Sequence, residues 1–218
     1  MTVVDLSHPI RDGMPAYPGV PPPRFGALRT HADVGTYAAG TSFHIGTYAL
    51  GGNTGTYVDA PFHRFPTGAD LASVPLERLV NIPGVIVDAP ADGPIAPGTV
   101  NIRACSSRAV LFRTGWAERW GTEAYFRSGP FLTAATCQAL VEARVVLVGI
   151  DCANVDDMTD AHRPAHTLLL GAGIPVVEHL RGLELLPPSG FRFTAAPPAL
   201  VGGTSFPVRA FAVVAAES

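Results

Sequence analysis

The chain has 218 residues, a formal net charge of −3 and 15% charged residues, which fits one domain with a sizeable core. All fifteen of its Lys+Arg residues are arginines, so Schiff-base chemistry and a P-loop phosphate site are excluded. The weak negative charge argues against nucleic-acid binding, and no apolar run approaches the roughly 20 residues that span a bilayer. The N-terminal residues lack a secretion signal, and three cysteines without C-x-x-C spacing favour reduced thiols. The sequence therefore predicts a cytoplasmic enzyme, ligand-binding domain or assembly subunit without membrane or nucleic-acid partners.

Glycine and proline, at 23 and 21 residues, are spread along the chain and predict many short strands joined by structured loops. The first strand is expected at residues 2–6, before a proline-rich arm over about residues 9–26 that cannot be helical. Later strands are predicted, in chain order, at residues 41–49, 84–88, 108–113, 145–150, 174–178 and 206–214. Helices are predicted at residues 75–79, 133–142 and 163–170. This mixture indicates a single α/β domain over residues 1–218.

Two of these elements have distinctive patterns. Residues 145–150 are apolar throughout, which predicts a central strand buried on both faces. In residues 133–142, Thr133 can cap a helix whose apolar side chains share one face. Those side chains are Ala134, Cys137, Leu140 and Val141.

The polar and glycine-rich segment 51–63 is the strongest candidate for chemistry. If residues 53–59 are extended, alternate side chains share one face. These are Asn53, Gly55, Tyr57 and Asp59. Pro61 then turns the chain and brings His63 near Asp59. An aspartate and a histidine placed together form a base with an orienting partner, or two metal ligands. The alternative is an aspartate that caps a turn and a histidine on the surface.

This segment resembles the H-x-G-T-H-x-D-x-P-x-H fingerprint of the cyclase family, which includes bacterial kynurenine formamidases and isatin hydrolases. Here Asn53 and Tyr57 stand in place of two histidines, whereas Asp59, Pro61 and His63 match. Nearly the whole chain shares the resemblance, at residues 5–10, 14–19, 149–151, 166–178 and 206–210. The resemblance implies a swivelling β/β/α arrangement with a mixed sheet. It also implies a homodimer or homotetramer, with the proline-rich arm as an exchange or interface element.

The same resemblance implies the metal ligands. Relatives with the full motif hold zinc or manganese with two leading histidines and the aspartate, and a distal histidine and glutamate complete a second site. The matching residues here are Asp59, His166 and Glu178, with His63 as general acid/base. Asparagine and tyrosine are poor replacements for imidazole, so the first metal position is expected to be weak or empty. One divalent metal and no organic cofactor are therefore expected, and His44 would supply a lost nitrogen only if its strand turns inward.

The leading functional hypothesis is an arylformamidase-like hydrolase that cleaves the C–N bond of a small amide or aryl formamide. His63 acts on the proton of water, with Asp59 as its orienting partner or as a metal ligand. Residues expected to contact the small-molecule substrate are Asn53, Thr56 and Arg163.

Two other hypotheses remain. In the first, a metal-independent cyclase, lyase or ring-opening enzyme of secondary metabolism uses Tyr57 as an oxyanion donor and His63 as base. In the second, a degenerate family member only binds a small ligand. Structural alternatives are a core aromatic ring for Tyr57 and a buried ion pair for His166 with Glu178.

Overall fold

The computed structural model describes residues 1–33 and 37–215. Its main sheet contains nine strands. They are β1 (Thr2–Asp5), β4 (Tyr57–Asp59), β5 (Ile82–Asp88), β7 (Ala109–Arg113), β9 (Leu147–Ile150), β10 (Val176–Glu178), β11 (Ser189–Thr194), β12 (Ser205–Pro207) and β13 (Phe211–Val214). Their spatial order is β1-β13-β11-β5-β7-β9-β10-β4-β12. The four strands from β5 to β10 in this order are parallel and the flanking pairs are antiparallel, so the sheet is mixed.

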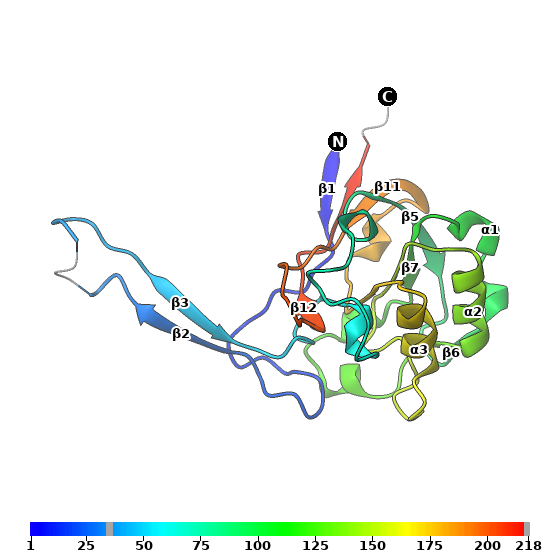
Figure 1. Ribbon diagram of the computed structural model, residues 1–218, viewed down its shortest axis with the longest axis horizontal. Coiled ribbons are helices and arrows are strands. Elements are labelled where there is room, and N and C mark those ends of the chain that lie inside the picture. The colour runs from blue at the N-terminus through cyan, green and yellow to red at the C-terminus, as the bar shows by residue number, and fades with distance from the viewer. Residues whose placement is uncertain (34–36, 216–218) are drawn as a thin grey trace.

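Three α-helices, α1 (Ile102–Cys105), α2 (Ala134–Glu142) and α3 (Pro164–Gly171), lie together at one side of this sheet (Figure 1). Short 3₁₀ helices occur at Pro61–His63, Leu76–Arg78, Pro97–Thr99, Trp116–Arg119, Glu123–Phe126 and Leu183–Leu185. Strands β6 (Pro94–Ile95) and β8 (Phe131–Leu132) form a small parallel pair. Within residues 1–33 and 37–215, no helix has the length and apolar character needed to cross a membrane.

The sheet is buried on both faces at its centre. Val148 of β9 joins the apolar cluster that also contains Leu140 of α2 and Leu169 of α3. Leu147, the neighbouring residue, belongs to a second cluster with Phe193 of β11. Because successive strand residues point to opposite faces, β9 is covered on both sides, which confirms the prediction of a central buried strand.

A two-stranded arm, made of β2 (Arg24–Arg29) and β3 (Ile45–Ala49), projects away from the sheet (Figure 1). Its antiparallel strands carry apolar side chains that are open to solvent, including Leu28 at 76% exposure and Tyr48 at 66%. An isolated two-stranded ribbon is at best marginally stable in water. The arm therefore differs from every other strand pair in having no apolar layer of its own among the described residues.

The single-domain α/β prediction is confirmed by this mixed sheet with few helices. Thr133 caps α2 as predicted, with its hydroxyl accepting from the Thr136 N–H at 3.2 Å. The prediction of one strand over residues 206–214 is wrong. The chain forms β12 and β13 there, because Pro207 has no N–H with which to continue a ladder. Strands β2 and β11 were not predicted, and residues 75–79 form only a short 3₁₀ turn.

The expected extended segment 53–59 is also shorter than predicted, because only Tyr57–Asp59 form a strand. Gly55 has a φ of +66°, so the residues before β4 turn rather than extend. A Cβ at Gly55 would lie 2.8 Å from Ile10 Cγ1. The space at Gly55 is therefore used by the chain itself, and only Tyr57 and Asp59 share the face that the alternation predicted.

Candidate active site

Asp59 ends β4, and His63 follows it on the next turn. Pro61 starts the 3₁₀ helix, and the His63 N–H donates to the Ala60 carbonyl at 2.8 Å. This turn brings His63 Nδ1 to 3.8 Å from Asp59 Oδ1. Asp59 is fully buried, whereas the His63 side chain is 33% exposed. The predicted proximity of the two residues is confirmed, and the distance is too long for a direct hydrogen bond.

His166 reaches the same place from the first turn of α3. Asp156 holds the start of this helix, because the Asp156 carboxylate accepts hydrogen bonds from the N–H groups of Ala165 at 2.6 Å and His166 at 3.1 Å. The same carboxylate lies 2.6 Å from His166 Nδ1. His166 therefore presents Nε2 to the site, at 3.5 Å from Asp59 Oδ2 and 3.8 Å from Glu178 Oε1. Asp156 orients the ring by contacting the nitrogen that faces away from the site.

Glu178 and Tyr57 form a buried pair on neighbouring strands. They stand opposite each other in the antiparallel ladder between β10 and β4. The Tyr57 hydroxyl donates to Glu178 Oε2, and the Val155 N–H donates to Oε1 at 2.6 Å. An oxyanion-binding function for Tyr57 would require its hydroxyl to leave Glu178. As placed, Tyr57 satisfies a buried carboxylate.

Burial and mutual charge shift the titration of these groups. Burial alone would lower the pKa of His166, but its hydrogen bond to Asp156 and the nearby charges of Glu178 and Asp59 raise that pKa to about 10. Burial raises the pKa of Glu178 to about 7, although the charge of His166 opposes the shift. Burial would also raise the pKa of Asp59, yet the charges of His63 and His166 and the hydrogen bond from Ser205 lower it. Without a cation, the site therefore holds an ionised Asp59 beside a protonated His166.

Three side chains are close enough to share a metal ion. One ligand atom from each of Asp59, His63 and His166 lies within 4.8 Å of the other two. This set differs from the predicted ligands, since His63 stands where Glu178 was expected. Asp59 Oδ2 is buried without a hydrogen-bond partner among residues 1–33 and 37–215, which is the position a cation would fill. One carboxylate and two imidazoles suit zinc or manganese, so the residues present fit a divalent metal.

A cavity of about 280 Å³ opens beside these groups. Asn53 and Arg163, two of the predicted substrate contacts, line it. The Arg163 guanidinium also donates to the carbonyls of Asp157 at 3.3 Å and Met158 at 3.4 Å, which anchors the preceding loop. The complete lining is Tyr17, Val20, Asn53, Tyr57, His63, Arg64, Asn154, Arg163 and His166. Tyr17 and Val20 show that the proline-rich arm contributes to the site as well as to β2.

Two residues considered for the site from the sequence, Thr56 and His44, lie outside it. The hydroxyl of Thr56 is buried, donates to the His179 carbonyl at 2.6 Å and accepts the His8 N–H at 2.9 Å. Thr56 therefore ties backbone segments together instead of lining the cavity. His44 lies on the arm beside His31, with ring centroids 6.1 Å apart, and supplies no nitrogen to the site. The reason is that β3 pairs with β2 and not with β4.

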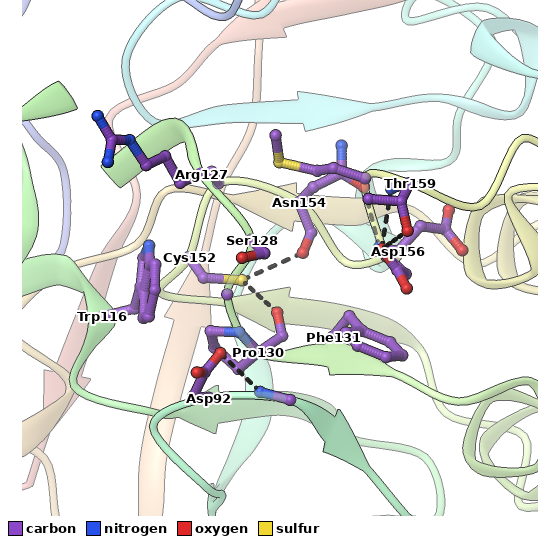
Figure 2. Close-up of a pocket in the computed structure, with 15 residues that line it drawn as sticks. Asp92, Trp116, Arg127, Ser128, Pro130, Phe131, Cys152, Asn154, Asp156 and Thr159 are labelled. Carbon is purple, nitrogen blue, oxygen red and sulfur yellow. Dashed lines mark hydrogen bonds between the residues drawn. The ribbon is translucent and has the colours of Figure 1, made fainter. Parts of the chain in front are cut away.

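A second cavity of about 180 Å³ is lined in part by Cys152, Asn154 and Asp156 (Figure 2). Asn154 lines both this cavity and the one beside His63. The Cys152 thiol donates to the carbonyls of Pro130 at 3.2 Å and Asn154 at 3.1 Å. Burial raises the pKa of Cys152, so the thiol stays protonated and acts as a structural donor.

Sequence reasoning did not identify Ser205 and did not assign a function to Asp156. Ser205 Oγ donates to Asp59 Oδ1 and lies 3.0 Å from His63 Nδ1. Asp156 had one available signal, because an acidic residue shortly before a predicted helix is a candidate cap. Ser205 had none, since its contacts depend on the pairing of strands that are distant in sequence.

Comparison with known proteins places this site in context. The profile of the cyclase family matches residues 4–157. The kynurenine formamidase of Salinibacter ruber is 32% identical over 215 residues, covering 96% of each chain. The structure of isatin hydrolase A from Labrenzia aggregata bound to benzyl benzoate is 25% identical, with a TM-score of 0.84 over 98% of this chain and 93% of that one. A structure described as a potential metal-dependent hydrolase with cyclase activity is 26% identical, with a TM-score of 0.77 over 97% and 96% of the two chains.

Proposed function

Because the chain belongs to the cyclase family, we propose that it is a hydrolase that cleaves the C–N bond of a small amide or aryl formamide. The observation that carries the proposal is the meeting of Asp59, His63 and His166 at one small cavity. Relatives named kynurenine formamidase and isatin hydrolase both act on amide-type C–N bonds, one open and one cyclic. A cavity of about 280 Å³ suits a substrate of that size.

His63 is the general acid/base of the proposed reaction. It is the partly exposed member of the group and lines the cavity, whereas Asp59 and His166 are buried. His63 takes a proton from the attacking water as the water oxygen bonds to the substrate carbonyl carbon. It then returns that proton to the departing nitrogen, which leaves as a neutral amine when the C–N bond breaks. Asn53 and Arg163 line the opening and are proposed to orient the substrate.

Asp59 and His166 are the proposed holders of one divalent metal, zinc or manganese. They belong both to the predicted set and to the group that the fold brings together. Glu178, whose Oε1 lies 3.8 Å from His166 Nε2, is proposed as the third ligand in place of His63, so that two carboxylates and one imidazole hold the metal and His63 is free to act on the proton. A cation bound there supplies Lewis-acid polarisation of the substrate carbonyl. Metal binding would replace the proton on His166 Nε2, since only a neutral imidazole binds a metal.

Turnover with and without metal tests the proposal. The purified full chain is loaded with zinc or manganese, or treated with a chelator, and given formanilide (a simple aryl formamide) or isatin. Release of formate or opening of the ring, lost on chelation and restored by metal, is the expected result. Turnover that survives complete removal of metal would instead support the metal-independent enzyme. Tight binding of both compounds without turnover would support a non-catalytic binding protein.

We also propose that the two-stranded arm formed by β2 and β3 joins two copies of this chain into a homodimer. Half of the large exposed apolar side chains in the described residues fall between positions 25 and 48. They are Phe25, Leu28, Tyr37, Phe43, Ile45 and Tyr48. A ribbon of this composition, with no apolar layer beneath it, is the kind of surface that a second copy covers. Leu28→Glu should convert the dimer to monomer in light scattering, whereas Val201→Glu, at a 90% exposed site on the body, should not. A monomeric wild-type chain would contradict the proposal.

A further inference from the structure

A third side chain connects Asp59 to His63. Ser205, the first residue of β12, is 5% exposed and lies within the site although it does not line the cavity. Its hydroxyl donates to Asp59 Oδ1 and lies 3.0 Å from His63 Nδ1. Since Asp59 and His63 are themselves 3.8 Å apart, too far for a direct hydrogen bond, this hydroxyl provides the hydrogen-bonded link between them.

The strand pairing fixes Ser205 in this position. β12 and β4 are antiparallel, and Ser205 stands directly opposite Asp59 in their register. The Ala60 N–H donates to the Thr204 carbonyl at 2.9 Å, which ties the two strands beside the pair. Gly52 allows the close approach, because a Cβ there would lie 2.5 Å from the Ser205 carbonyl oxygen. A shift of one residue would turn the hydroxyl to the other face of the sheet.

The count of protons determines the direction of both hydrogen bonds. A serine hydroxyl has one proton to donate, and an ionised carboxylate can only accept. The proton therefore points to Asp59, because two acceptor oxygens could not otherwise approach so closely. Towards His63 the Ser205 oxygen can then only accept, through one of its two lone pairs, so Nδ1 must carry the proton in that contact. Nε2 is then the unprotonated nitrogen of a neutral His63.

Asp59 thus uses its two oxygens for different purposes. Oδ1 accepts from Ser205, and Oδ2 faces His166 at 3.5 Å without a hydrogen-bond partner in residues 1–33 and 37–215. The side of the carboxylate that serves His63 is separate from the side available to a cation. His63 can therefore remain a base while a metal is bound on the other side.

We propose that Ser205 is a positioning residue of the hydrolysis reaction, which links Asp59 to His63 and holds the ring with Nδ1 protonated and Nε2 as the base. The inference rests on the proposed function for its chemistry. When Nε2 takes the proton from water, the positive charge on His63 is stabilised by Asp59 through the Ser205 hydroxyl. The proton leaves again with the amine, so the Ser205 proton is not consumed in a turnover.

Ser205→Ala removes the hydroxyl and leaves the rest of the site in place. With formanilide as the probe, kcat is expected to fall by about 10- to 100-fold, as for other groups that orient a reacting imidazole. KM is expected to stay within about twofold, because Ser205 does not line the cavity. Ser205→Thr keeps a hydroxyl on a strand position and is expected to restore most of kcat.

Ser7→Ala is the matched control. Ser7 is also a buried serine, at 4% exposure, and its hydroxyl contacts the carbonyls of Val208 and Ala210 near the same strand. It contacts neither Asp59 nor His63, so its kcat should equal that of the wild type. An equal loss of kcat in both alanine variants would show a general packing effect and overturn the inference. So would a Ser205→Ala variant with wild-type kcat.

Nitrogen-15 NMR of the His63 ring tests the link without turnover. The wild type is expected to show the tautomer with the proton on Nδ1, and Ser205→Ala is expected to lose it. If the wild type shows this tautomer but hydrolyses no amide, the proposed function fails and the hydrogen-bonded link stands. If the wild type is active and the tautomer is the same in both proteins, the function stands and the inference about Ser205 is overturned.

Discussion

The arm and the end of β4 reverse the usual rule of burial in opposite ways. On β2 and β3, Leu28 and Tyr48 are apolar side chains in water, at 76% and 66% exposure. At the end of β4 and on β10, Asp59 and Glu178 are carboxylates with no exposure. Exposed apolar and buried charged side chains are the two informative exceptions to the burial rule.

The difference between the two regions is in what completes each one. The buried carboxylates have partners within the chain, since Tyr57, Val155 and Ser205 donate to them. One atom, Asp59 Oδ2, remains without a hydrogen-bond partner in residues 1–33 and 37–215 and faces the site. Within residues 1–33 and 37–215, the strands of the arm pair with each other and leave Leu28 and Tyr48 exposed. We propose that a small cation or substrate completes the first region, and that a second copy of the chain covers the second.

The largest effect expected from a change in the buried region is on catalysis. His63→Ala should reduce kcat on an aryl formamide by about 10²- to 10⁴-fold, the usual contribution of general acid/base catalysis. Because the His63 side chain is 33% exposed, its loss leaves a small gap at the surface and the fold should survive. Steady-state rates measured beside thermal unfolding check both statements. A variant with full activity would remove His63 from the mechanism.

Replacing an aromatic side chain by alanine distinguishes the stability of the arm from that of the apolar core of the main sheet. Phe193→Ala, in the second apolar cluster with 0% exposure, should lower the free energy of unfolding by about 3–5 kcal/mol. Tyr48→Ala on the arm should change it by no more than about 0.5 kcal/mol when the chain is dilute enough to be monomeric. Urea unfolding of both variants measures the contrast. Equal losses would mean that the arm is part of the folded core.

A smaller effect tests a buried polar group that does not act in the reaction. Burial lowers the pKa of His8 to about 3, with the charges of His179 and Arg181 adding to the shift. His8 binds its proton less readily when folded, so stability is full above about pH 6.5 and falls as pH decreases toward 3. Between pH 7 and 5 this one group should cost about 2 kcal/mol.

His8→Phe keeps the stacking on Trp120, whose ring lies 4.0 Å away, and removes the titration. Unfolding curves of this variant should therefore show a flatter dependence on pH than those of the wild type. A slope unchanged from the wild type would assign the pH dependence to other groups.

Local geometry made part of the site predictable. The contact of Asp59 with His63 follows from four residues of separation and the proline between them. The helix that carries His166 and the strand that carries Glu178 also have local patterns, but only family resemblance connected them with Asp59. Register between strands distant in sequence, β4 with β10 and with β12, brings these side chains together.

The positions of the residues that were not predicted are set by such long-range strand pairing. Ser205 meets Asp59 across 146 positions of sequence, so no local pattern indicates it. The alternation in residues 41–49 predicted a strand correctly but did not show that β3 would pair with β2 away from the main sheet. His44 was a candidate ligand only on the condition that its strand turned inward, and this pairing does not meet that condition. A periodic pattern predicts that a strand forms, whereas tertiary packing decides which neighbour it has.

Hydrolysis of formanilide in water enriched in oxygen-18 tests the central claim most directly. The account predicts that formate and aniline are released in equal amounts and that each formate carries one oxygen from the solvent, because water attacks the carbonyl carbon. His63→Ala should form this labelled product about 10²- to 10⁴-fold more slowly. Disappearance of the substrate without formate, or formate without solvent oxygen, would contradict hydrolysis of the C–N bond at this site.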